Sequence, residues 1–250
     1  MTLHAPHSIP DAVFEHARAA FATAGQTLQN VRRDFPEWHR GRPRYALWAL
    51  DVDVAPVREA VAGATWHLDG YLLDDYRRQP HITLALCGFP SNSPQHADDF
   101  GPAALGAQLA ALQAQAPAPF AVEIGQLASF SSAPFLAARD VDGGIHALRR
   151  ALTGEQPEPG GPYTPHVTVG LYGGAWPTAR VQAQLDGFDG QAAIHCPIER
   201  LSLMSYAALE IGGPLETLAD FCLITQQLVW RKGGQTSPLA RLHERTAATP

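Results

Sequence analysis

The sequence has few cysteines. Only three occur in 250 residues, at Cys87, Cys196 and Cys222. They form no Cys-x-x-Cys pair, and no cysteine and histidine have the spacing of a zinc site. We therefore expect reduced structural thiols, with neither a disulfide framework nor bound zinc.

Long apolar runs are also missing. No stretch approaches the ~20 apolar residues that a membrane-spanning helix needs. The first residues do not combine a basic segment with an apolar run, as a signal peptide would. These absences predict a soluble, cytoplasmic protein that does not bind membranes.

Positive charge is in deficit. Lys and Arg total 18 against 24 Asp and Glu, which gives a net charge of −6. Proteins that bind long duplex nucleic acid usually carry a basic surface, and the short arginine pairs, such as Arg77-Arg78, are equally typical of solvated loops. No glycine-rich loop has the spacing that binds nucleoside triphosphates or dinucleotides. We therefore expect the protein to bind a small phosphodiester, nucleotide or RNA end and to need no cofactor. We also expect a monomer.

The central part of the chain alternates between strand and helix patterns without a regular βαβ rhythm, which predicts an α+β fold. The expected strands are Tyr45–Val52, His81–Leu86, Phe120–Phe130, Phe135–Arg139, His166–Tyr172, Leu201–Tyr206 and Phe221–Val229. The expected helices are Pro56–His67, Gly101–Gln115, Gly144–Leu152 and Trp176–Leu185.

The two ends of the chain differ from the centre. Residues 1–40 are predicted to form an N-terminal helical extension, with helical spacing over Asp11–Phe35. Residues 41–231 form the main domain, and the polar residues 232–250 are predicted to be a flexible C-terminal tail. We expect removal of residues 1–40 to leave the main domain folded.

One nine-residue segment occurs twice. The segment Pro80–Gly88 (PHITLALCG) aligns without gaps on Pro165–Gly173 (PHVTVGLYG), with proline, histidine, threonine, leucine and glycine identical. Two such segments, 85 residues apart, indicate two related half-domains.

Side chains alternate between the two faces of a strand. His81 and Thr83 therefore share one face of the first copy, and His166 and Thr168 share one face of the second. The aliphatic residues between them should face the core, including Leu86 and Leu171. The small residues Ala85 and Gly170 should lie on the histidine face and leave room for a ligand. If the halves are related by a pseudo-two-fold axis, the four polar side chains meet at one point.

These four side chains suit phosphate chemistry. Two imidazoles can act as general base and general acid near neutral pH, and two threonine hydroxyls can donate hydrogen bonds to phosphoryl oxygens. A single His-x-Thr is more often a solvated strand face, whereas two copies in matched frames favour a site. No carboxylate lies beside either motif at ligand spacing, so we expect no metal.

With these motifs the chain resembles the two-histidine (2H) phosphoesterase superfamily, which includes RNA 2′,3′-cyclic phosphodiesterases also called 2′–5′ RNA ligases. Its pattern, two His-x-Thr-x strands, matches His81–Leu84 and His166–Val169 in full. The resemblance implies a bilobal, pseudo-symmetric fold with two antiparallel sheets flanked by helices around a central cleft. It also implies that His81 and His166 are catalytic, that Thr83 and Thr168 bind phosphate, and that the reaction is metal-independent hydrolysis of a cyclic phosphodiester.

Two other functions share these residues. One is a non-catalytic nucleotide- or RNA-binding module, against which the intact pair of histidines argues. The other is 2′–5′ RNA end-joining, the reverse of the same chemistry. Alternation also places Tyr172 on the face of His166, where it is a candidate for stacking on a base. Weaker candidates of that kind are Phe130, Tyr163, Trp176 and Tyr206.

Overall fold

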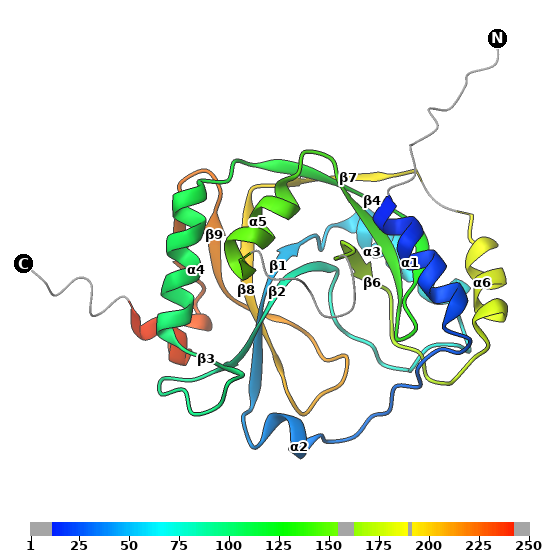
Figure 1. Cartoon of the computed structure of the whole chain (residues 1–250), viewed down its shortest axis with the longest axis horizontal. Helices are drawn as coiled ribbons and strands as arrows, with labels where there is room; N and C mark the ends of the chain where they lie inside the picture. The colour runs from blue at the N-terminus through cyan, green and yellow to red at the C-terminus, as the bar shows by residue number, and fades with distance from the viewer. Residues whose placement is uncertain (1–11, 155–162, 190–191, 243–250) are drawn as a thin grey trace, which may run out of the picture.

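The protein contains two β-sheets with helices packed around them (Figure 1). A computed structural model describes residues 12–154, 163–189 and 192–242. In these parts of the chain no helix is long and apolar enough to cross a bilayer. The expected α+β class with two antiparallel sheets is confirmed.

The larger sheet has six strands in the order β10-β9-β8-β1-β2-β3. All neighbouring pairs are antiparallel except β2 and the short β3. Its strands are β1 (Arg44–Asp51), β2 (His81–Pro90), β3 (Asp99–Phe100), β8 (Arg200–Ala207), β9 (Glu216–Cys222) and β10 (Gln227–Trp230).

The smaller sheet is antiparallel throughout, with the order β6-β5-β4-β7. Its strands are β4 (Phe120–Ser129), β5 (Pro134–Asp140), β6 (His166–Thr168) and β7 (Ile194–Ile198). The first sequence motif thus opens β2 in the larger sheet, and the second forms β6 in the smaller sheet.

Helices α3 to α6 form two groups (Figure 1). Helices α4 (Pro102–Gln115) and α5 (Gly144–Thr153) cover the larger sheet, where the indole of Trp48 donates a 2.9 Å hydrogen bond to Gln108 of α4. Helices α3 (Ala55–His67) and α6 (Thr178–Asp186) lie beside the smaller sheet and contact each other through His67 and Gln184. Proline in the first turn of α3 and α4 favours the start of a helix because no partner is needed for its missing N–H.

The two faces of β1 enter different clusters. Trp48 and Leu50 are buried in the main core under the helices. Leu47 and Ala49 point the other way and pack with Met204 and Leu215. Because His81 pairs with Asp51, two residues along from Ala49, it lies on this second face, away from the helices.

Several boundaries differ from the sequence prediction. The strand expected over His166–Tyr172 ends at Thr168. The strand expected over Phe221–Val229 is two strands, β9 and β10, joined by a turn in which Gln226 has a positive φ. Strands β3 and β7 and the four-residue helix α2 (Pro36–His39) were not predicted.

The N-terminal segment is part of the folded unit. Helix α1 (Ala12–Thr23) ends well before the expected Phe35 and buries Phe14, Ala17 and Phe21. Phe14 and Ala17 pack on Ala128 and Phe135 of the smaller sheet. This packing argues against the expected removable extension for residues 12–40, and residues 1–11 lie outside the described part of the chain.

The C-terminal segment also packs on the domain. Two 3₁₀ turns, η1 (Gly234–Thr236) and η2 (Pro238–Leu242), follow β10, and Leu239 is fully buried in the main core. A flexible tail is therefore wrong for residues 232–242, whereas residues 243–250 of that prediction lie outside the described residues.

Candidate active site

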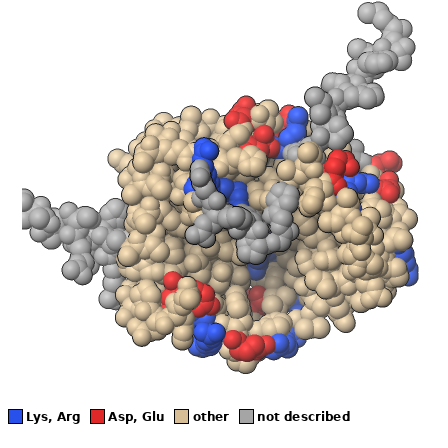
Figure 2. All heavy atoms as spheres, viewed as in Figure 1, with Lys and Arg blue, Asp and Glu red and all other residues tan. Residues whose placement is uncertain are grey.

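His81 and His166 lie near each other, one in each sheet. Each is the first residue of its strand, and β2 and β6 contact each other. The two imidazoles are close enough for the charge of His166 to act on the pKa of His81. Figure 2 shows a hollow at the centre of the face that is turned to the viewer, with basic and acidic side chains along the lower rim of the hollow.

Both histidines have the same hydrogen bond. Nδ1–H of His81 donates to the carbonyl of Gln79, and Nδ1–H of His166 donates to the carbonyl of Thr164, each over 2.8 Å. A carbonyl only accepts, so Nδ1 carries the proton and Nε2 of the neutral ring has a free lone pair. The two rings therefore have the same tautomer, as expected for two copies of one repeated segment.

Both imidazoles have pKa values below the ordinary 6.5. Burial lowers the pKa of His81 to about 4, with a further decrease from the positive charges of Arg78 and His166. Burial also lowers the pKa of His166, which is opposed by the hydrogen bond to Thr164. Both rings are therefore neutral at pH 7 in the free protein, and each can accept a proton at Nε2.

The threonines are held by two tyrosines. The hydroxyl of Tyr163 donates a 2.6 Å hydrogen bond to the backbone carbonyl of Thr83. The side chain of Tyr76, in the loop before β2, lies close enough to Thr168 for that side chain to act on the pKa of the Tyr76 hydroxyl. Both threonine side chains are half-buried, at positions two residues after each histidine. The structure thus brings together the four residues that the two motifs supply.

A β-bulge changes the face on which later residues of β2 lie. Thr83 pairs with Ala49 and Ala85 pairs with Trp48, so Leu84 is an extra residue in β2. Ala85 is consequently buried in the main core, and Leu86 pairs with Leu47 on the histidine face, 67% exposed. The expectation that Ala85 lines the cleft and Leu86 faces the core is wrong because it assumed unbroken alternation.

Helix α5 and Tyr163 hold the bulge in place. The guanidinium of Arg149 donates to the carbonyl of Leu84 and lies 3.5 Å over the ring of Tyr163. Tyr163 in turn binds the carbonyl of Thr83. These bonds satisfy two consecutive carbonyls beside the irregular residue, so the conformation that exposes Leu86 is specifically stabilised.

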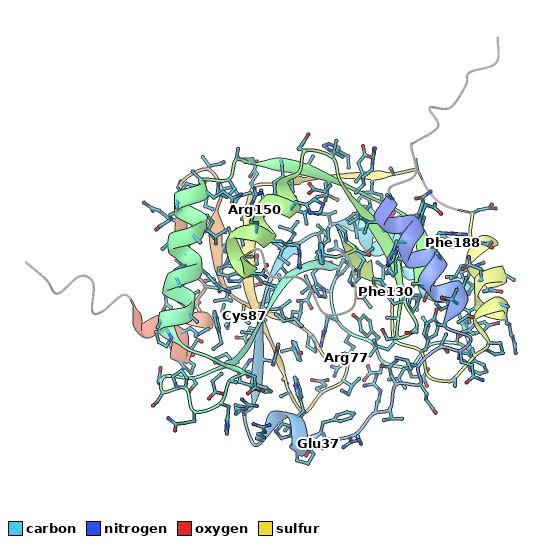
Figure 3. All side chains as sticks on the ribbon, in the orientation of Figure 1. Glu37, Arg77, Cys87, Phe130, Arg150 and Phe188 are labelled. Atoms are coloured by element: carbon cyan, nitrogen blue, oxygen red, sulfur yellow. The ribbon has the colours of Figure 1, made fainter. Side chains whose placement is uncertain are left out.

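Arg78 is a cation of the site that sequence analysis placed among the solvated arginines. Its guanidinium lies 4.3 Å over the ring of Tyr206, and its Nε donates to the carbonyl of Gly213 over 3.3 Å. Its charge acts on the pKa of His81, Tyr76 and Tyr206. The only sequence signal was its position three residues before His81. Figure 3 labels the neighbouring Arg77 in the loop below β6.

Tyr172 cannot stack on a base in this structure. Its side chain is fully buried, and its hydroxyl is 2.6 Å from that of Ser129. The alternation of side chains between the two faces of a strand does not reach Tyr172, because β6 ends at Thr168. Among the weaker candidates, Phe130 contacts His166 edge-on with ring centroids 4.9 Å apart, and Figure 3 shows Phe130 beside β6.

Cys87 has no features of a nucleophile. Burial raises the pKa of its thiol to about 12, so the reactive thiolate is scarce. Within the described ranges 12–154, 163–189 and 192–242, no group of three or more His, Cys, Asp or Glu residues is placed to hold a metal ion. The groups described around the site are the two imidazoles and the neighbouring hydroxyl and guanidinium groups.

Residues 43–210 match the family model described as the 2′-5′ RNA ligase superfamily. The chain belongs to this superfamily. The matched range contains both histidine motifs, Arg78 and Leu86, and excludes α1, α2, β9 and β10. A comparison with curated proteins gave no match.

Several solved structures are similar to the chain at low identity. TT0787 of Thermus thermophilus is 20% identical, with a TM-score of 0.45, over 72% of this chain and 97% of that one. E. coli LigT in its apo form is 14% identical, with a TM-score of 0.45, over 73% and 98%. E. coli LigT complexed with 3′-AMP is 15% identical, with a TM-score of 0.43, over 72% and 98%. Membership of the 2′-5′ RNA ligase superfamily therefore rests on the sequence match.

Proposed function

We propose that this superfamily member hydrolyses a 2′,3′-cyclic phosphate, on a nucleotide or an RNA end, without a metal ion. In this proposal His81 and His166 transfer the protons, and Thr83 and Thr168 bind the phosphate. The observation that carries it is the matched pair of imidazoles, buried at His81 and half-buried at His166, each with Nδ1–H donated to a carbonyl two residues earlier. Two such rings provide a base and an acid at one point.

The reaction needs one neutral ring and one protonated ring. The neutral ring accepts a proton at Nε2 from a water molecule, whose oxygen forms a bond to phosphorus. The bond from phosphorus to one ribose oxygen breaks, and the imidazolium gives its proton to that oxygen, which leaves a phosphomonoester. The negative charge of a bound phosphate raises the pKa of both rings and so supports the imidazolium form.

The surroundings of the four residues suit such a substrate. Arg78 supplies positive charge beside His81 in a chain whose net charge is −6, which localises anion binding to the site. Leu86 follows Thr83 on the same face and is 67% exposed, so it offers an apolar contact next to the phosphate. A sugar or base attached to the phosphate would cover this side chain.

Hydrolysis in EDTA tests this proposal. The substrates are a 2′,3′-cyclic nucleotide and a short RNA with a cyclic phosphate end, and the proteins are wild type, His81→Ala and His166→Ala. We expect each variant to lose about 10²-fold or more of the rate, as for loss of an acid or base. His195→Ala is the matched control, because His195 is exposed on β7; it should keep the wild-type rate.

Three outcomes would contradict the proposal in different ways. Loss of turnover in EDTA that a divalent ion restores would show that the chemistry needs a metal. Binding of the nucleotide without turnover would favour the binding module. Net joining of a cyclic phosphate end to a 5′-hydroxyl RNA, faster than hydrolysis, would favour the ligase reaction instead.

A further inference from the structure

We propose that Asn30 and Arg32 are positioning residues for His166 and Thr168, so that the segment before the family-matched range is part of the active site. This inference rests on the proposed function of the two motifs. It extends that proposal to residues 24–35, which connect α1 with α2 and precede the matched range that begins at residue 43.

Asn30 is bound to the β4–β5 turn. Its side-chain Nδ2 donates to the carbonyls of Ser132 over 3.0 Å and Tyr172 over 3.1 Å, and its backbone N–H donates to Tyr172 over 2.8 Å. The backbone N–H of Leu28 donates to the carbonyl of Ser131 over 2.7 Å. Residues 131 and 132 are thus held in place by the N-terminal segment.

This turn carries a ring that contacts His166. Phe130 stacks on Phe135 with centroids 4.3 Å apart and meets His166 edge-on at 4.9 Å, with an interplanar angle of 81°. Phe135 also contacts His166 at 5.4 Å. Beyond the hydrogen bond to Thr164, these two aromatic rings define the space that the imidazole of His166 occupies. A shift of the turn would therefore change the orientation of Nε2.

Arg32 is bound to the two loops on the other side. Its guanidinium donates to the carbonyl of Ile211 over 2.9 Å and to the carbonyl of Asp74. Asp74 lies two residues before Tyr76, whose side chain lies beside that of Thr168 and is affected by it. Ile211 lies two residues before Gly213, whose carbonyl accepts from Arg78. Arg32 thereby fixes the loops that carry the partner of Thr168 and the cation of the site.

The apolar side chains of the segment are not what holds it. Leu28 and Val31 are 59% and 47% exposed, whereas Asn30 and Arg32 direct their donors to carbonyls of neighbouring loops. A segment with only a packing role would bury its aliphatic residues. The contacts of Asn30 and Arg32 instead end on the turn and loops that contact the second motif.

The test compares Asn30→Asp, Asn30→Ala and Arg32→Ala with the control Arg33→Ala in the full chain. Asn30→Asp keeps the size of the side chain and removes its N–H donors. Arg33 is next in sequence but pairs with Glu37, outside the site. We expect kcat for the cyclic nucleotide to fall about 10-fold in the three test variants, with KM within about twofold of wild type, as for misplaced reacting groups. Arg33→Ala should leave both constants unchanged.

The imidazole signals in NMR spectra separate this inference from the proposed function. Burial lowers the pKa of His166, and we expect the Asn30 variants to move it toward 6.5 as the Phe130 turn loosens, whether or not the wild type turns over the cyclic nucleotide. Wild-type kcat together with unchanged His166 signals in both Asn30 variants would overturn the positioning role and leave the hydrolysis proposal standing. An inactive wild type whose His166 signal still responds would support the positioning role and overturn the hydrolysis.

Discussion

At the residue scale, the backbone and the burial of the two histidines determine the tautomer and the charge of each ring. A carbonyl two residues earlier fixes the tautomer of each ring, and burial keeps each ring neutral. The sequence motifs identify His81 and His166. They do not give the pKa values of these residues, because the pKa values depend on residues of other segments, such as Arg78. The proposed acid–base pair was therefore predictable from the sequence, and its electrostatics were not.

The lowered pKa values predict a displaced pH profile. In the free enzyme the form with one imidazolium and one neutral ring is most abundant between about 4, the pKa of His81, and a value below 6.5. We expect kcat/KM to follow a bell that peaks below pH 6.5. Because bound phosphate raises both pKa values, kcat should peak at higher pH. Coincident profiles for kcat and kcat/KM would show that the phosphate does not bind beside the imidazoles.

Leu86 makes a second prediction at this scale. If its exposed side chain contacts the sugar or base, Leu86→Ala should raise KM by about 5-fold, since removing buried apolar atoms costs roughly 1 kcal/mol or more, while kcat is unchanged. Ile224→Ala is the matched control, because Ile224 is 66% exposed and follows β9. Steady-state kinetics on the cyclic nucleotide measure both. An equal KM in wild type and Leu86→Ala would remove Leu86 from the substrate site.

At the scale of elements, strands and helices with clear periodicity were predicted well. Strand β1 and helices α3, α4 and α5 fall within one or two residues of the expected ranges. The failures occur where a local pattern is overridden by a distant partner. The bulge in β2 depends on Arg149 and Tyr163, about 65 and 80 residues away in the chain, and α1 depends on the smaller sheet for its buried face.

Arg149 should support the bulge measurably. Arg149→Ala leaves the carbonyl of Leu84 without its guanidinium donor, and an unsatisfied buried polar group costs about 1–3 kcal/mol. We expect the midpoint of urea unfolding to fall accordingly and the hydrolysis rate to decrease, because Thr83 and Leu86 lose their support. Arg150→Ala, at the exposed neighbouring position on α5, should change neither. Equal stability of the two variants would mean that the bulge does not need Arg149.

At the scale of the whole molecule, the repeated nine-residue segment anticipated the two-sheet architecture. The repeat gives no information on how the two ends of the chain pack on the sheets, because α1, the segment 24–35 and η2 have no counterpart within the sequence. Phe14, Ala17 and Phe21 of α1 are buried, and Leu239 of η2 enters the main core. The two ends therefore belong to the same folded unit as the sheets.

Truncation tests this view. Removal of residues 1–35 exposes the apolar face of the smaller sheet that α1 covers, and burial of a single Phe contributes roughly 1.5–3 kcal/mol. We expect the truncated protein to unfold at least about 10 °C below the full chain in a thermal melt, or to aggregate. A truncated protein with the melting temperature of the full chain would restore the interpretation of residues 12–35 as a separable extension.

The most direct measurement of the central claim is a comparison of His81→Ala, His166→Ala and the double variant on a 2′,3′-cyclic nucleotide in EDTA. Groups that act as one unit are strongly non-additive. We predict that each single variant loses about 10²-fold or more and that the double variant is hardly slower than either. A single variant that retains the wild-type rate, or a double variant in which two independent losses multiply, would contradict a paired mechanism.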